Sequence, residues 1–196
     1  MDGAELSNLA SRDILLAPRW GGVFAVDQFP KNLQDGFIYV LSDQPSHVVK
    51  THWRLISTIG PHIYFFCSYG TPPKNKKVIL SLRKLGKPLI YNTRQLQLSG
   101  SQVCGLHVIF LAILLVRDFS LSSIIRNFYS SNLLKNDLMV SSYISVCLRA
   151  RKSVPQIFSS ESRLKNDSHE KFQEVDEKKS KNRKKISNGP RKKIDE

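Results

Sequence analysis

The sequence is poor in cysteine, and this shortage restricts the classes of protein that it can encode. Only three cysteines occur among 196 residues, at Cys67, Cys104 and Cys147. An odd number without close spacing signals neither a disulfide framework nor a Cys-x-x-Cys metal site. We therefore expect a protein of a reducing compartment.

The chain also lacks a secretory or membrane-spanning segment. The residues after Met1 do not show the basic and then apolar regions of a signal peptide. The apolar run that begins at Cys104 stops at Arg117, which is too short to cross a bilayer. The sequence thus predicts a soluble intracellular or particle-enclosed protein that is not secreted and has no membrane partner.

Acidic residues are scarce relative to basic ones: 16 Asp and Glu stand against 30 Lys and Arg, a net charge of +14. Residues 1–148 and the much shorter segment 149–196 each hold 15 basic and 8 acidic side chains. The second segment has too few apolar residues to fold alone. We expect a domain at 1–148 and a basic, disordered tail at 149–196. Such a tail favours nucleic acid or another polyanion, with a solubilising or nuclear-localisation role as the alternative.

Hydrophobic patterning indicates an α+β domain with strands in the middle and helices at both ends. A short helix within 1–20 is expected to end at Pro18. The expected strands are 23–26, 37–41, 51–59, 63–67 and 89–93, the third and fourth forming a hairpin. Later helices are expected at 78–85, 104–116, after a cap at Ser120, and within 132–148.

Cys104 begins the most apolar of these helices. Unpaired backbone N–H groups and the positive end of the helix dipole favour thiolate over thiol at this position. A nucleophilic cysteine would be placed there, although a small buried residue that starts a core helix is the simpler explanation.

Two further residues complete a candidate constellation. His52, at the start of a strand before Trp53, can serve as a general base. Gln97 precedes Cys104 by seven residues on the loop leading to the helix, and its amide can donate a hydrogen bond to an oxyanion. A lone histidine before a tryptophan is usually structural, so the order of the three residues is more specific than any one of them.

With these residues, the sequence resembles the adenovirus endopeptidase (adenain) family and, more closely, the related proteases of adintoviruses and Maverick/Polinton elements. The resemblance covers roughly residues 10–146. It is carried by segments 22–30, His52-Trp53, 64–70, 97–105, 118–121 and Asn136-Asp137.

The resemblance implies the fold of the adenain and ubiquitin-like-protease clan, a central β-sheet flanked by helices. It also implies a monomeric cysteine endopeptidase that processes viral or element-encoded precursor proteins in the virion or the host nucleus. By this likeness His52 is the general base, Gln97 the oxyanion donor and Cys104 the nucleophile. No cofactor is required, while DNA is a possible activator, and an activating peptide cannot be inferred.

One position departs from the family. Cys67 occupies the place of the acidic residue that orients the histidine, and a neutral thiol accepts hydrogen bonds weakly. Asp27 or Asp43 could replace the acid in space, or Cys67 could itself pair with His52 as a thiolate. A Zn²⁺ site formed by Cys67, His52 and Cys104 is a further hypothesis.

The departure leaves a second class of function open. The chain could be an inactive protease descendant that retains the fold as a binding or structural module with a nucleic-acid-binding tail. A deubiquitinase-like or deSUMOylase-like host enzyme is a third hypothesis, for which the sequence offers no specific feature.

Overall fold

The structure is a computed structural model that describes residues 1–48, 51–149 and 173–174. Its central element is a mixed β-sheet with the strand order β1-β2-β3-β4-β5-β6. The strands are β1 (Trp20–Phe24), β2 (Ile38–Ser42), β3 (Trp53–Ser57), β4 (Ile63–Phe66), β5 (Leu89–Tyr91) and the two-residue β6 (Gln173–Glu174). The pairs β1·β2 and β4·β5 are parallel, and the other three pairs are antiparallel.

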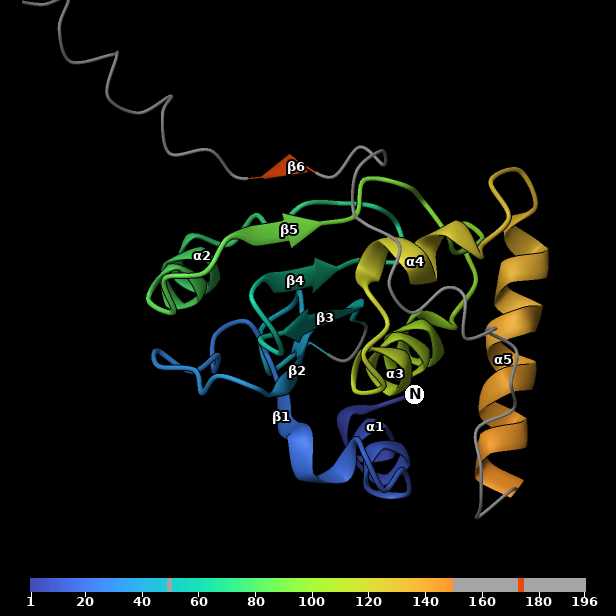
Figure 1. The fold of residues 1–196 in the computed structure, drawn as a ribbon, viewed down its shortest axis with the longest axis horizontal. Helices are drawn as coiled ribbons and strands as arrows, with labels where there is room; N and C mark the ends of the chain where they lie inside the picture. Colours follow the sequence, from blue (N-terminus) through green and yellow to red (C-terminus); the bar gives the residue numbers. More distant parts are fainter. Residues whose placement is uncertain (49–50, 150–172, 175–196) are drawn as a thin grey trace, which may run out of the picture.

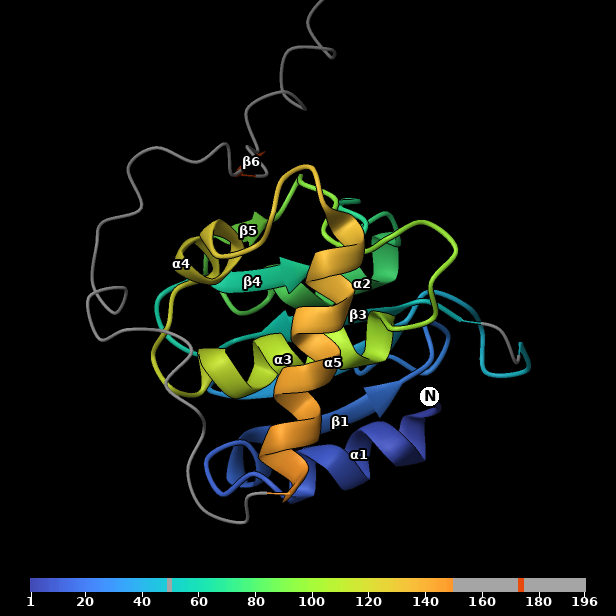
Figure 2. The ribbon, with the colours of Figure 1, turned by 90° about the vertical axis from the view of Figure 1, so that its right-hand side faces the viewer.

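Helices cover both faces of this sheet, so the predicted α+β class is confirmed (Figures 1 and 2). One face carries α1 (Gly3–Ser11), α3 (Cys104–Leu115), α4 (Leu121–Arg126) and α5 (Leu133–Arg149), and the other carries α2 (Lys76–Arg83). In Figure 2, α3 lies between the sheet and α5. No helix in the described ranges is long and apolar enough to span a membrane.

The alternation of side chains along the strands divides the core into two clusters. Ile38 and Val40 of β2 pack on the α3 side, whereas Tyr39 and Leu41 pack on the α2 side. All five residues of β2 are buried, as expected for a strand covered on both faces. Every residue of α3 except Leu106 is buried, which explains why its sequence is apolar all round.

Most of the predicted elements are present, and the hairpin is the antiparallel pair β3·β4. The cap at Ser120 is confirmed, because its side chain accepts a hydrogen bond from the Ser123 N–H. The predicted end of the first helix at Pro18 is wrong. The helix stops at Ser11 because the Asp13 carboxylate accepts the Leu15 and Leu16 N–H groups in a turn of its own.

The domain boundary predicted at residue 148 falls at the end of α5, which extends to Arg149. Within the predicted tail, Gln173 and Glu174 pair with β5. The rest of that prediction lies outside the described residues.

Candidate active site

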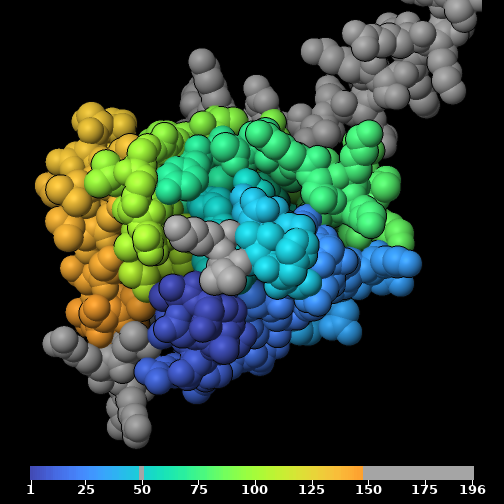
Figure 3. All heavy atoms as spheres, turned by 180° about the vertical axis from the view of Figure 1, so that it is seen from behind, coloured from blue at the N-terminus to red at the C-terminus, as the bar shows by residue number. Residues whose placement is uncertain are grey.

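Three segments that are distant in the sequence come together at the candidate site: the residues that enter β3, the turn that leaves β4, and the first turn of α3. Figure 3 shows the first and last of these, cyan and yellow-green, on one face together with α1 in dark blue. His52 lies just before β3 and Cys67 just after β4, so both residues lie at the same end of the β3·β4 hairpin. α3 packs against β3 and brings in Cys104.

Cys104 starts α3 without a side-chain cap. The N-cap residue is Val103, which offers no oxygen to the free N–H groups of the first turn. Burial opposes ionisation of the Cys104 thiol, but interactions with the His52 side chain and with the Trp53 and Gly105 backbone N–H groups outweigh burial and lower the pKa of the thiol.

The His52 ring lies between two sulfur atoms. Its Nε2 is 3.2 Å from the Cys67 Sγ, and its side chain also interacts with the Cys104 thiol. Burial favours the neutral ring, but the two sulfur partners outweigh it and raise the pKa of His52 to about 9. The Tyr69 ring stacks on the imidazole with centroids 4.7 Å apart, which fixes the plane of the ring.

The carboxylates considered as replacements for the missing acid do not reach this ring. Asp43 accepts the His52 backbone N–H at 3.1 Å and pairs with Arg54 at 3.4 Å. Asp27 accepts the backbone N–H and the hydroxyl of Ser46. In the described part of the chain, the partner of Nε2 is the sulfur of Cys67.

Gln97 is fully buried next to the turn after β4. Its Oε1 accepts the Ser68 hydroxyl at 2.6 Å, and its Nε2 donates to the backbone oxygen of Ser101 at 2.8 Å and to the Ser101 hydroxyl at 3.0 Å. The amide therefore points into its own loop. To donate to an oxyanion it must release or share its contact with Ser101.

Helix α5 fixes this loop from the other side, through two adjacent buried residues. Asn136 Nδ2 donates to the Leu96 carbonyl at 2.9 Å, and Asp137 accepts the Leu98 N–H at 3.3 Å. The other oxygen of Asp137 is 2.9 Å from His107 Nε2 on α3. Sequence reasoning gave these residues no role, because their partners lie 30 to 40 positions away.

The N-terminal residue covers the first turn of α3. The Trp53 indole N–H donates to the Met1 carbonyl at 3.0 Å, and a Cβ atom on Gly105 would lie 2.6 Å from the Met1 sulfur. The glycine after the candidate nucleophile thus leaves room for Met1.

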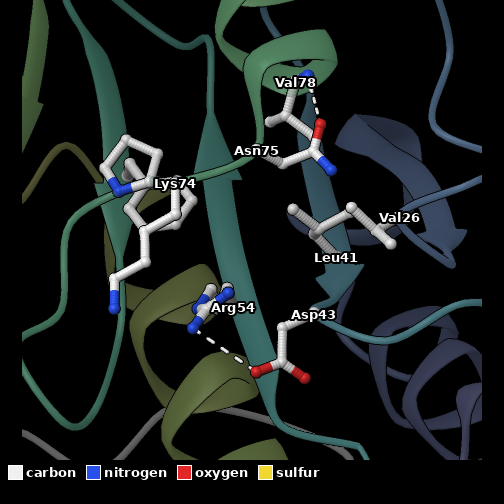
Figure 4. Close-up of a pocket in the computed structure, with 9 residues that line it drawn as sticks. Val26, Leu41, Asp43, Arg54, Lys74, Asn75 and Val78 are labelled. Atoms are coloured by element: carbon white, nitrogen blue, oxygen red, sulfur yellow. Dashed lines mark hydrogen bonds and ion pairs between the residues drawn. The ribbon is translucent and has the colours of Figure 1, made fainter.

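A cavity of about 380 Å³ lies beside the site, on the α2 face of the sheet (Figure 4). Arg54 points toward Asp43 at one side of it, and Lys74 and Asn75 line the opposite part. Its other lining residues are Val26, Leu41, Phe65, Pro73 and Val78. Asp43 lines this cavity and also accepts the hydrogen bond of the His52 backbone N–H, so the cavity lies next to a residue that positions the histidine.

No group of three His, Cys, Asp or Glu side chains in the described ranges is arranged to hold a metal ion. The zinc hypothesis for Cys67, His52 and Cys104 therefore gains no support.

Comparison of the chain with models of known families gave no match, and comparison with curated proteins gave none either.

Proposed function

We propose that the protein is a cysteine endopeptidase in which Cys104 is the nucleophile and His52 the general acid and base. The observation that carries this proposal is the placement of Cys104 at an uncapped helix N-terminus, where His52 interacts with its thiol. The thiol pKa is lowered and the imidazole pKa is raised, which is the combination that a thiolate–imidazolium pair requires.

The chemistry follows from the positions of these groups. The Cys104 thiolate attacks a peptide carbonyl, and the free N–H groups of the first turn of α3 face the oxygen that becomes negative. The protonated His52 then donates its proton to the leaving amine. Neutral His52 next activates a water molecule, which hydrolyses the thioester and returns the thiolate.

The sequence resemblance supports the finer part of the proposal: an adenain-like protease of viral or mobile-element origin that cleaves precursor proteins. The order of His52, Gln97 and Cys104 matches that family, whereas Cys67 departs from it. Gln97 takes the oxyanion role if substrate binding draws its amide away from Ser101.

Covalent labelling tests this function. Full-length protein is incubated with a set of peptide vinyl sulfones, and intact-mass spectrometry locates the adduct. We expect one adduct, on Cys104, which is lost in Cys104→Ala and retained in the matched variant Cys147→Ala. Folded protein that no peptide of the set labels would contradict the proposal, and would favour the alternative of a non-catalytic binding module.

We further propose that the basic segment 149–196 binds nucleic acid, with DNA as a possible activator of the peptidase. Its 15 basic side chains support this role through counterion release. Binding to a DNA duplex should weaken steeply with added salt. It should also weaken strongly in a protein truncated after Leu148, and unchanged affinity in that protein would contradict the role.

A further inference from the structure

Cys67, the residue that departs from the protease pattern, has surroundings that suit a negatively charged sulfur. Cys67 is fully buried, and its sulfur has two polar partners: His52 Nε2 at 3.2 Å and the Thr71 hydroxyl at 3.0 Å. A neutral thiol is a weak hydrogen-bond partner, and two close partners on one buried sulfur are better suited to a thiolate.

The Thr71 hydroxyl has a second contact. Arg54 Nη2 lies 3.5 Å from the Thr71 oxygen, and a guanidinium has only donors. The Thr71 oxygen therefore accepts from Arg54, which leaves its single hydrogen available to a thiolate at Cys67. Arg54 Nε is buried without a hydrogen-bond partner in the described ranges, so this cation is not saturated by Asp43.

The backbone of Cys67 is fixed from two sides. The Asn92 side chain, 98 % buried after β5, accepts the Cys67 N–H at 3.0 Å and donates to the Cys67 carbonyl at 2.8 Å. The Gly70 N–H also donates to that carbonyl, at 2.8 Å. Gly70 has φ +68°, and a Cβ atom there would lie 2.7 Å from the backbone of Thr93 and Arg94. The sulfur is therefore held in place for His52.

We propose that Cys67 is the third member of the catalytic triad, as a buried thiolate that receives hydrogen bonds from Thr71 and from protonated His52. Cys67 and Thr71 are positioning residues in this arrangement, and Arg54 orients Thr71. The proposal deepens the peptidase function given above and rests on it for its catalytic meaning, whereas the charge on Cys67 can be measured without any peptidase activity.

The charges balance as in a triad with a carboxylate. Two thiolates and one imidazolium carry a net charge of −1, the same as a carboxylate, an imidazolium and one thiolate. Ionisation of the two thiols releases two protons, of which His52 holds one and the solvent takes the other. Burial opposes the thiolate, but the hydrogen bonds of His52 and Thr71 outweigh it and lower the pKa of Cys67 to about 6.

Other charged and titratable groups near the sulfur fit this state. From β3, Arg54 supplies a positive charge that Asp43 only partly offsets. From α3, Cys104 adds a second negative charge, and the shared His52 ring offsets one of the two negative charges. Burial raises the pKa of the stacked Tyr69, so this group remains neutral.

Thiolate absorbance in the ultraviolet tests the proposal. The full-length variant Cys104→Ser with Cys147→Ser retains Cys67 as its one thiol. We expect its thiolate signal to appear with a midpoint near pH 6, and to move upward by at least one pH unit when His52→Gln is added. A midpoint at or above the ordinary thiol value of about 8.5 in the His52 protein would overturn the proposal, whether or not the protein cleaves peptides.

Three Thr variants in the same background separate a specific contact from a general loss of structure. Thr71→Val should raise the Cys67 midpoint, and Thr71→Ser should restore it. The matched variant Thr51→Val should leave the midpoint unchanged, because that hydroxyl bonds to Ser42 and Asp43. Equal midpoints in the Thr71→Val and Thr71→Ser proteins would remove Thr71 from the proposal.

The catalytic meaning is tested in the protein with all other residues intact. Cys67→Asp should label with a peptide vinyl sulfone within about 10-fold of the unaltered rate, while Cys67→Ala should lose about 100-fold. Equal rates for Cys67→Asp and Cys67→Ala would contradict a triad role. A low Cys67 midpoint in a protein whose Cys104 never labels would instead overturn the peptidase function and leave the charge assignment standing.

Discussion

Two histidines among the described residues lie beside groups that can carry a negative charge, and their pKa values shift in opposite directions. His52 is partly exposed between two sulfur atoms, and its pKa is raised to about 9. His107 is fully buried, and its Nε2 is 2.9 Å from the Asp137 carboxylate. Burial outweighs the effect of that carboxylate and lowers the pKa of His107. A carboxylate partner alone therefore does not make an imidazolium, since the cost of burial decides which form prevails.

The two histidine rings also differ in their surroundings. His107 packs against Phe128 in the core and connects α3 to α5 through Asp137. His52 has its ring beside a thiol at an uncapped helix N-terminus, next to the surface. The carboxylate–histidine pair is thus a structural link between α3 and α5, and the thiol–histidine pair is the one to which we assign the proposed chemistry.

The largest expected difference between the two rings is catalytic. His52→Gln should slow labelling of Cys104 by a peptide vinyl sulfone about 1,000-fold, because the thiol loses its base. His107→Gln, the matched change in the core, should alter the rate by less than about 10-fold after correction for folded protein. Equal losses in both variants would show that His52 acts only through the fold.

The second difference is in stability. Asp137→Ala removes the partner of His107 and of the Leu98 N–H, and should lower the free energy of unfolding by about 3 kcal/mol in a urea titration. The exposed carboxylate of Asp27 provides the matched change, and Asp27→Ala should cost clearly less. Similar losses would mean that the buried pair is not a link between α3 and α5.

A smaller and more specific difference is the effect of pH on stability. Because the pKa of His107 is lowered in the native protein, the unfolded chain binds a proton at a pH at which the native His107 ring is still neutral. Stability should therefore fall as pH drops below about 6.5, by at most about 1.4 kcal/mol per pH unit. The raised pKa of His52 acts in the opposite sense: its contribution is complete below about pH 6.5 and is lost as pH rises through about 9.

Unfolding measured across this pH range should therefore separate the two residues. His107→Gln should flatten the acid side of the stability curve, whereas His52→Gln should change the curve above about pH 6.5, where Cys67 and Cys104 titrate together with His52. A change on the same side in both variants would contradict the opposite protonation of the two rings.

The sequence predicted the parts of this site that depend on local pattern. Apolar periodicity placed Cys104 at the start of a helix, and strand patterning predicted the hairpin, whereas the relation of Cys67 to His52 came from the family resemblance. Short turn signals also predicted the cap at Ser120. These features need only near neighbours in the sequence, and the structure has them.

The contacts that tune the chemistry could not be predicted in this way. Asn92 reaches Cys67 across 25 positions, and Asp137 reaches His107 across 30. Thr71 is close to Cys67 in sequence, but the other contact of its hydroxyl is Arg54, which comes from β3. The buried amide of Gln97 points to Ser101, a choice that is set by the packing of the loop.

The central claim, a Cys104 thiolate paired with His52, is tested most directly by the pH dependence of alkylation. Full-length protein is treated with iodoacetamide, and mass spectrometry of peptides follows each cysteine. Cys104 should react well below the ordinary thiol range, whereas Cys147, whose pKa burial raises, should react only at alkaline pH. Identical alkaline profiles for the two cysteines would contradict the account.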